Sequence, residues 1–495
     1  MKKMNLLVMS LVSAAALSFT SCSSNDDLAG NAGQEKVDGF YMTLNVQTPK
    51  SDGTRTAVNK PTENATAEES DVTSGTIYLV DAAGKIVFTK EITESEWKAG
   101  QKPTQGKDGS TQIKIEVDKV VADQTYNVYF LAGSNKPAGG MNFAATSNNF
   151  FTAAENSFAS PFADDNNFAM FNQNDSQVDG NGYTVTFIKA NNNEANPAKV
   201  NYKDKKSTIT NAPIKVERVV ARIDAPTSKS TVLADAPADA SAALKVAMKE
   251  AKEKVEKIEL TNYAISNLAN KSYVMQTWNS SSALVIPSDK EGFSYIQPTA
   301  DFGGTFDYND GGFTTTEATK VNYVFENNST TAPTTMYFEY KVTLKDMTGA
   351  DFTDKDGEYA GTFYRYNNVI YTSFDQIFKD YEGVQDLFAK GENAESMKNK
   401  LKEAIKDEAQ LAKFRQDYNI EVFKGGKTYY KHVIKDNHIN GIIQRNSIYR
   451  LNINNIFNVG AQVPNGEPTE NDFYYLNVSV TVNPWVLNED NVDLQ

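Results

Sequence analysis

A strict alternation of apolar and polar residues limits the folds open to this 495-residue chain. It is cleanest at residues 39–47 (GFYMTLNVQ), where one parity carries Phe40, Met42, Leu44 and Val46. Successive side chains of a β-strand point to opposite faces, so the pattern predicts a strand with one buried face.

Shorter apolar runs recur along the chain between turns rich in Gly, Asn and Asp. They predict further strands at 76–80, 85–90, 113–117, 126–132, 183–188, 212–224, 257–265, 273–278, 283–287, 335–344, 359–366, 427–433, 447–457 and 473–483. Short strands separated by such turns favour antiparallel β-sandwiches. The fold is therefore predicted to be mainly β, with two antiparallel β-sandwich domains.

Two segments have a helical period instead. Residues 239–257 and 392–418 each place apolar side chains on one face: Leu244, Met248, Ala251, Val255 and Ile258 in the first, and Met397, Leu401, Ile405, Leu411 and Phe414 in the second. Their outer faces mix both charge signs, which predicts helices that cover a sheet rather than a membrane surface. Both would be helical insertions in the C-terminal domain. The Ala/Pro/Ser-rich stretch 225–241 places the domain boundary near Pro226.

The N-terminus predicts export. Lys2 and Lys3 precede an apolar run at 6–19 that is too short to span a membrane, and Thr20-Ser21-Cys22 follows. This is the pattern of a lipoprotein signal, although Phe19 is a loose fit to the branched aliphatic residue expected there. The alternative is a secretory signal with an incidental cysteine. Cys22 is the only cysteine, so its lipidation, for example with palmitate, leaves none for a disulfide.

Composition and motifs argue against several functions. The net charge of −14 without a basic stripe argues against nucleic-acid binding. The only histidines, His432 and His438, lack an HExxH arrangement and are predicted to lie in a surface loop. GxSxG, Walker A and GxGxxG motifs are missing, and residues 351–359 (DFTDKDGEY) fit a polar turn better than a calcium loop. We therefore expect no enzyme activity, catalytic residue, metal site or cofactor.

Two further segments carry arginines in contrasting surroundings. Residues 216–224 (VERVVARID) predict a core strand through Val216, Val219, Val220 and Ile223, with Arg218 and Arg222 pairing with nearby acids. Residues 51–57 (SDGTRTA) predict an exposed loop around Arg55, which suits cleavage by a trypsin-like protease.

These features, taken in order with the C-terminal KTYYKHVI, NSIYRLNINNI and VSVTVNPWVLNEDNVDLQ, resemble the fimbrillins. Fimbrillins are the subunits of type V pili in Bacteroidales-type bacteria. The nearest resemblance is to the major subunit of the short (minor) fimbriae, and it implies that both β-sandwiches are transthyretin-like.

The resemblance also implies a route of assembly. The precursor reaches the outer membrane as a lipoprotein, a trypsin-like protease cuts after Arg55, and the lipid leaves with the first strand. The C-terminal strand of another copy fills the groove, which builds an extracellular fimbrium that supports adhesion and biofilm formation. The expected parts are a signal peptide (1–21), a lipidated propeptide (22–55), an N-terminal domain (56–226), a C-terminal domain (227–485) and a donor strand (486–495).

Two details of this route stay open. Lys50 is a second candidate for the cut. The donor is either the tail alone, with Val486, Val492 and Leu494 on one parity, or the tail together with 473–483. Pro484 supports a break between these two segments, because proline cannot continue a central ladder.

The expected partners are other copies of the chain, tip and anchor subunits, the protease, the outer membrane and surface ligands of host or bacterial cells. A stalk role is favoured over tip or anchor. The competing hypothesis is a monomeric surface lipoprotein that binds a glycan or host ligand through exposed aromatic residues; 24 Tyr, 27 Phe and 3 Trp supply the material.

Overall fold

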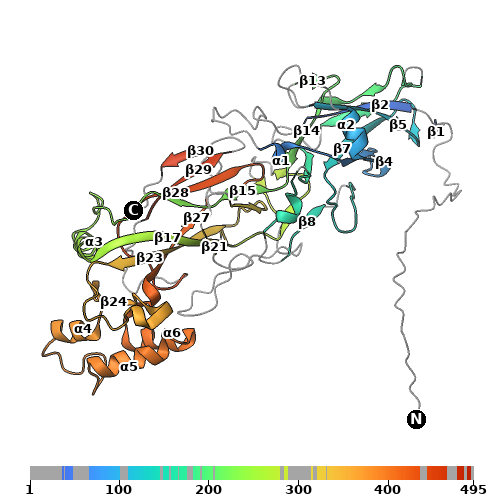
Figure 1. The fold of residues 1–495 in the computed structure, drawn as a ribbon. Coiled ribbons are helices and arrows are strands. Elements are labelled where there is room, and N and C mark those ends of the chain that lie inside the picture. The colour runs from blue at the N-terminus through green and yellow to red at the C-terminus, as the bar shows by residue number, and fades with distance from the viewer. Residues whose placement is uncertain are drawn as a thin grey trace, which may run out of the picture.

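The computed structural model describes most of the chain from residue 66 onward, and two short ranges before it. The described residues are 36–37, 40–47, 66–100, 110–144, 149–154, 158–165, 167–174, 182–189, 192–203, 207–278, 284–287, 314–315, 320–330, 332–434, 443–464, 476–483 and 488–491. Strands predominate in these ranges (Figure 1), which confirms the prediction of a mainly β fold. The division into two transthyretin-like sandwiches stays a prediction.

The N-terminal part is built on a large sheet. Its strands run in the order β11-β2-β14-β9-β7-β10-β12-β13, with β5 on β2, β3 on β7 and β4 on β3. The bounds are β2 Phe40–Gln47, β3 Gly75–Val80, β4 Ile86–Ile92, β5 Ser110–Val117, β7 Thr125–Ala132, β9 Met170–Asn172, β10 Tyr183–Thr186, β11 Ala198–Lys199, β12 Asn201–Lys203, β13 Thr208–Ile209 and β14 Ile214–Arg218. The short helices α1 (Ala67–Ser70) and α2 (Glu94–Gly100) accompany it, and Trp97 of α2 is buried against Phe130 at a ring-centroid distance of 5.6 Å.

Two more sheets form the second part of the chain. One has the order β22-β15-β28-β29-β30 with β16 on β28, and the other has the order β21-β17-β23-β27. Their bounds are β15 Ala221–Asp224, β16 Thr227–Ser228, β17 Val255–Ser266, β21 Thr314–Thr315, β22 Val321–Val324, β23 Thr335–Leu344, β27 Lys427–Val433, β28 Ile448–Ile456, β29 Leu476–Asn483 and β30 Asn488–Asn491. Buried side chains from both sheets form one cluster, so the sheets pack face to face.

The remaining short strands make small sheets. They are β1 Lys36–Val37 with β6 Val120–Val121, β8 Phe150–Thr152 with β18 Lys271–Tyr273, β19 Thr277–Trp278 with β20 Leu284–Val285, and β24 Phe363–Tyr366 between β25 Val369–Tyr371 and β26 Glu421–Phe423.

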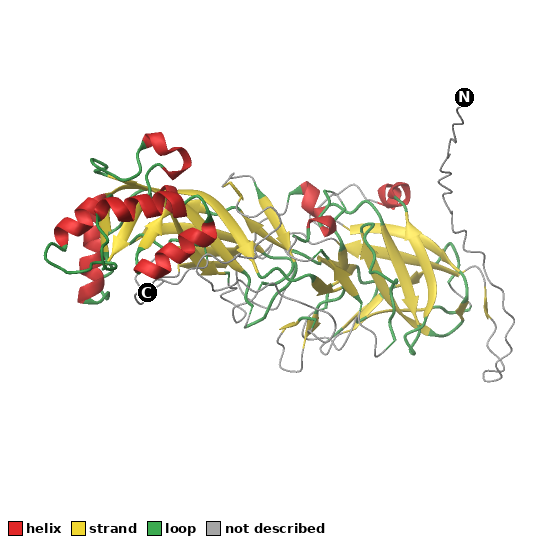
Figure 2. Cartoon of the chain, turned by 90° about the horizontal axis from the view of Figure 1, so that it is seen from below, coloured by secondary structure: helices red, strands yellow, loops and turns green. Residues whose placement is uncertain are grey.

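A helical lobe lies between β23 and β27 in the sequence, at the end of the molecule far from β2 (Figures 1 and 2). It contains α4 (Phe374–Asp380), α5 (Ala394–Ala404) and α6 (Glu408–Tyr418) around a third buried cluster. Arg365 of β24 forms a buried ion pair with Glu421 of β26 inside their small sheet. Arg365 also donates to the Val459 carbonyl at 2.9 Å, which links this sheet to the second buried cluster. The predicted helical insertions in the second part are confirmed.

The structure corrects two predicted elements. Residues 212–224 are not one strand, because the chain leaves the first sheet at Val219–Val220 and enters another sheet as β15. The buried residues of the N-terminal part, among them Leu44 and Phe130, form a first cluster that reaches Val220 in this segment, and the second cluster, formed mainly by the two sheets of the second part, begins at Ala221. Residues 392–418 are not one helix either, since Asp407 caps α6 by accepting the N–H of Gln410 at 2.9 Å.

Helix α3 (Ala242–Lys254), predicted within 239–257, supplies a local test of stability. Ser241 caps it by accepting the N–H of Leu244 at 3.3 Å. We expect Ser241→Ala to lower the free energy of unfolding by about 1 kcal/mol, because the first turn loses its side-chain acceptor. Ser241→Asp retains an acceptor and is expected to match the wild type in urea unfolding. Equal midpoints for all three proteins would contradict the assignment of this cap.

Candidate functional site

Strand β2, predicted at 39–47, is an inner strand of the first sheet. It pairs antiparallel with β5 over its whole length, from Phe40 opposite Val117 to Gln47 opposite Ser110. It also pairs in parallel with β11 at Met42 and with β14 at Val46. Because β5 occupies one edge throughout, β11 and β14 occupy the other. Both edges of β2 are therefore hydrogen-bonded to other segments of the chain.

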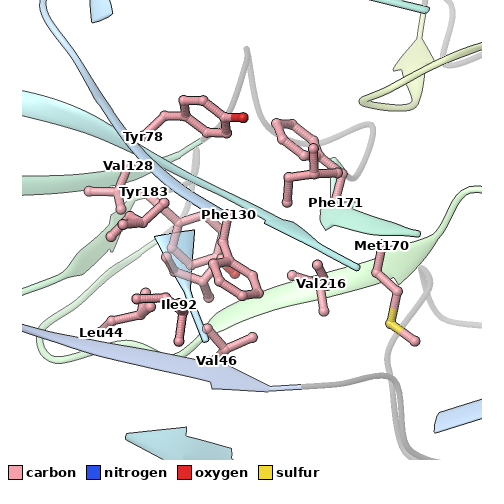
Figure 3. Close-up of a cluster of buried hydrophobic side chains, with 14 of the residues drawn as sticks. Leu44, Val46, Tyr78, Ile92, Val128, Phe130, Met170, Phe171, Tyr183 and Val216 are labelled. Carbon is pink, nitrogen blue, oxygen red and sulfur yellow. The ribbon is translucent and has the colours of Figure 1, made fainter. Parts of the chain in front are cut away.

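The predicted alternation of β2 is confirmed by its burial. Phe40 is 4% exposed and Met42, Leu44 and Val46 are 0% exposed, whereas the residues between them are half-buried. Figure 3 shows Leu44 and Val46 pointing from β2 toward the cluster that contains Ile92, Phe130 and Val216. One face of the strand thus forms part of the core.

The Phe40 end of β2 meets an aromatic group. Its ring lies 5.5 Å from that of Phe187, which in turn lies 6.1 Å from Tyr126. Tyr126 is fixed because its hydroxyl accepts the N–H of Val121 at 2.8 Å. The other end of the strand is lined by aliphatic residues, with Ile214 beside Val46. The space that β2 fills therefore suits a large ring at one end and a branched aliphatic side chain at the other.

The energetic consequence of losing β2 is large. Burial of an apolar side chain of this size contributes roughly 1.5–3 kcal/mol. Loss of the strand would also leave N–H and C=O groups of β5 without a partner, because β2 is the strand with which β5 pairs among the described residues. A core that lacked β2 would have a strong tendency to take up another strand with the same alternation.

The residues that line this space could not be identified as a set from the sequence. Ile113 and Ile115 of β5 and Ile214 of β14 are all buried. The alternation of 113–117 predicted the strand, but nothing in the local pattern names β2 as its partner some 70 residues earlier. Within 212–224 the apolar alternation breaks at Val219, where two valines follow each other, and this break is the sequence signal that β14 ends there.

The last two described strands, β29 and β30, belong to the second part. Strand β29 pairs with β28 from Leu476 opposite Ile456 to Asn483 opposite Ile448. Among the described strands, β30 pairs only with β29, at four positions from Asn488 to Asn491, and so lies at the edge of its sheet. The predicted donor residues Val486, Val492 and Leu494 lie outside the described residues, as do Cys22 and Arg55.

Other candidates are structural. His432 is not in a surface loop: it lies in β27 opposite Met336 and is 8% exposed, because the run 427–433 is a strand packed within the second part. His438 lies outside the described residues. The segment 351–359 is a capped turn in which Asp351 accepts the N–H of Phe374 at 2.8 Å. Within the described ranges, no three His, Cys, Asp or Glu side chains are grouped to hold a metal ion.

Arg222 pairs with a nearby acid as predicted, through Asp224 at 2.5 Å, and also with the distant Glu69 at 2.7 Å. Arg218 is fully buried, and its Nε donates to the Glu69 carbonyl oxygen at 2.7 Å. Burial lowers the pKa of Arg218 to about 9, although the Glu69 carboxylate opposes this shift. Burial, followed by the same carboxylate, raises the pKa of Tyr323.

The helices that the structure describes include none with the length and apolar character needed to cross a membrane. The predicted signal peptide at 1–21 lies outside the described residues. Its assignment stays a prediction.

Solved structures of other bacterial proteins are similar to this chain over much of its length, and two of them are described by their names as fimbrial. A fimbrilin from Porphyromonas gingivalis is 14% identical, with 93% of this chain and 99% of that one covered and a TM-score of 0.43. A fimbrial assembly protein from Parabacteroides distasonis is 16% identical, with 63% and 100% covered and a TM-score of 0.23. At such low identities and TM-scores, neither likeness bears on function.

Among curated proteins, none matches this sequence. A family model does match residues 421–491, the range from β26 to β30. It is described as the C-terminal region of fimbrillin, the major fimbrial subunit protein type IV. This match confirms, for residues 421–491, the resemblance to the fimbrillins drawn from the sequence motifs.

Proposed function

We propose that this protein is a fimbrial subunit that is exported as a lipoprotein through Cys22, cut after Arg55 and polymerised by strand exchange. The observation that carries the proposal is β2. It is buried on one face and bonded along both edges, yet it lies in sequence between the lipidation site and the cleavage site. A single cut after Arg55 would therefore release the lipid and an inner strand of the fold together.

The lipid acts as a transport device in this scheme. Cys22 holds the precursor at the outer membrane, and a trypsin-like protease finds Arg55 in a loop of small and polar residues. The mature subunit begins at Thr56 and has no cysteine. The subunit has no catalytic role in this scheme, which agrees with the structural character of the fimbrillin family.

Strand replacement follows from the two edges of β2. A donor must bond to β5 along its whole length and bring apolar side chains to alternate positions. The tail offers Val486, Val492 and Leu494 for this purpose. The pairing of the last strands supports the tail, which contains β30, as the donor in preference to β29. Release of β30 breaks its pairing with β29 at four positions, whereas release of β29 would break its pairing with β28 at eight.

A stalk role fits a chain that has both a removable strand and a tail, since each copy can then accept one neighbour and donate to the next. The polymer would join tip and anchor subunits and present surfaces to host or bacterial ligands. The alternative is a monomeric lipoprotein that binds a glycan or host ligand, and proteolysis of the precursor distinguishes the two.

Mild trypsin treatment of the purified precursor tests the proposal. We expect a new N-terminus at Thr56 and a ladder of oligomers that resists denaturant, because each freed groove takes up the tail of another copy. The Arg55→Ala variant is expected to give no product that begins at Thr56, whereas Lys50→Ala should behave as the wild type. Complete cleavage after Arg55 with a product that stays monomeric would refute assembly by strand exchange and support the monomeric binder.

A further inference from the structure

Helix α1 lies where the first and second buried clusters meet. It precedes Val72, which belongs to the first cluster and bridges to Asn167. Its residue Glu69 is 3% exposed and contacts residues on β15 and β22 of the second part. Thr66, the first described residue after the predicted cut, directly precedes this helix.

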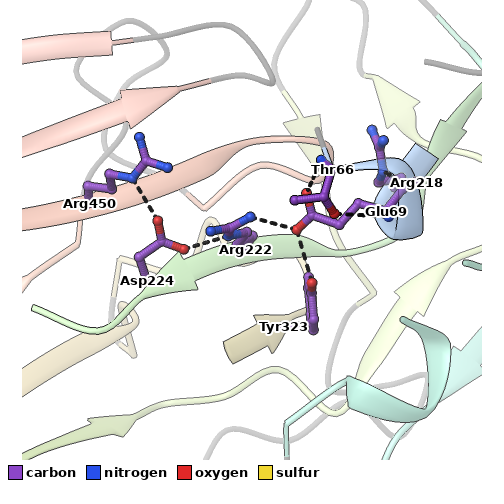
Figure 4. A network of polar contacts seen from close by, with 7 residues as sticks. All are labelled: Thr66, Glu69, Arg218, Arg222, Asp224, Tyr323 and Arg450. Carbon is purple, nitrogen blue, oxygen red and sulfur yellow. Dashed lines mark hydrogen bonds and ion pairs between the residues drawn. The ribbon is translucent and has the colours of Figure 1, made fainter. Parts of the chain in front are cut away.

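Glu69 uses both carboxylate oxygens and its main chain. One oxygen accepts the N–H of Thr66 at 3.1 Å, and the N–H of Glu69 donates to the Thr66 hydroxyl at 3.3 Å, which forms a capping box. The other oxygen accepts Nη1 of Arg222 at 2.7 Å and the hydroxyl of Tyr323 at 3.0 Å. Figure 4 shows these contacts converging on one carboxylate.

The network continues into both parts of the molecule. Arg222 and Arg450 of β28 bind the two oxygens of Asp224, at 2.5 and 2.7 Å. Arg218 of β14 joins the Glu69 carbonyl to the side chain of Asn446, at 2.7 and 2.9 Å. Strands β14, β15, β22 and β28 are thus tied to a four-residue helix (Figure 4).

An aromatic ring packs against the most buried part of this network. The ring of Phe168 in the first cluster meets Tyr323 edge-on at 5.2 Å, and the guanidinium of Arg218 lies 6.0 Å from the centre of the same ring. Removal of the Glu69 carboxylate would take one of two carboxylate partners from Arg222 and the acceptor from the Tyr323 hydroxyl.

We propose that Glu69 is a latch that fastens the chain just after the removable strand to the junction of the two parts. The latch keeps residues 66–80 in place when β2 leaves, so that the opening is confined to the space of β2. The contacts of the latch are those of the uncut chain, whereas its role when β2 leaves rests on the proposed function.

Hydrogen exchange of the uncut full-length chain tests the latch. We compare the wild type with Glu69→Gln, which removes the charge and replaces one accepting oxygen by a donating NH2 group, so that the donors on one side of the group lose their acceptor. Glu68→Gln is the matched control, because Glu68 lies on the same helix but is exposed. In Glu69→Gln we expect about tenfold faster exchange in peptides that cover 66–72 and 221–224, with β5 unchanged.

Two results would overturn the latch. One is exchange in Glu69→Gln that equals that of Glu68→Gln. The other is an equal acceleration in β5 and β7, which would show a general loss of stability. Should Glu69→Gln fail to fold, Tyr323→Phe removes one donor only and is expected to accelerate the same two peptides by about threefold. None of these outcomes involves cleavage at Arg55, so they are independent of the proposed function.

Discussion

Replacement of Leu44 by Asp is expected to lower the free energy of unfolding of the uncut chain by about 5 kcal/mol or more. Leu44 is 0% exposed on the core face of β2. Truncation of a buried leucine alone costs about 2–5 kcal/mol, and a buried carboxylate adds the loss of its hydration. Urea unfolding of the purified precursor measures the effect.

A matched control lies on the other face of the same strand. Thr43 is half-buried and lies opposite Lys114, so we expect Thr43→Asp to cost about 1 kcal/mol or less. Leu44→Ala, with an expected loss of about 2–5 kcal/mol, serves if the Asp variant does not fold. Similar losses for positions 43 and 44 would contradict the one-sided burial of β2.

Maturation makes this prediction specific to the proposed function. After a cut at Arg55, residue 44 no longer belongs to the subunit. Polymers grown from Leu44→Ala precursor should therefore match wild-type polymers in their resistance to denaturant. If they unfold as much more easily as the precursor does, the first strand has stayed in the subunit and the proposed strand exchange is wrong.

The part of the site that the sequence could predict is the part with a local pattern. Phe40, Met42, Leu44 and Val46 alternate within one short run, and that run is a strand with those side chains buried. Alternation reports which face of a strand is buried, because side chains two residues apart share a face. It does not report which strands are neighbours, so β5, β11 and β14 could not be named as partners.

The errors arose where a continuous apolar run hid a change of partner. In VERVVARID the adjacent Val219 and Val220 are both fully buried, which no single half-buried strand allows. They mark the passage from one core to the other. In 392–418 the signal was present: Asp407, followed three residues later by Gln410, is an N-cap signature that divides α5 from α6.

The Glu69 network had no signal in the sequence. Glu69 and Arg222 are 153 residues apart, and Glu69 and Tyr323 are 254 residues apart. Charged residues in a short polar segment are usually exposed, so composition predicted the opposite of what the fold does with Glu69. Only the placement of α1 between the two clusters gives this residue its partners.

Deletion of residues 486–495 is expected to abolish polymerisation while leaving the cut after Arg55 intact. In the second part, β30 is an edge strand, and β29 remains bonded to β28 at eight positions without it. The shortened chain should therefore fold with little loss of stability, be cleaved by trypsin and remain monomeric, because its open groove finds no donor. Size-exclusion chromatography in denaturant-free buffer measures the outcome.

A mixture of two variants, one of which can only accept a strand and the other only donate one, tests the groove and the donor independently. The cut deletion variant has an open groove and no tail, whereas uncut Arg55→Ala has a tail and a filled groove. An equimolar mixture should give heterodimers and no ladder, since each dimer presents neither a free donor nor a free groove.

Substitutions in the tail of the Arg55→Ala chain test which side chains enter the groove. Val492→Asp with Leu494→Asp places charges on the face that plugs the groove and should prevent the dimer, whereas Asp493→Asn should not. If the deletion variant instead forms ladders like the wild type, the donor is β29, and the tail beyond Pro484 is dispensable for assembly.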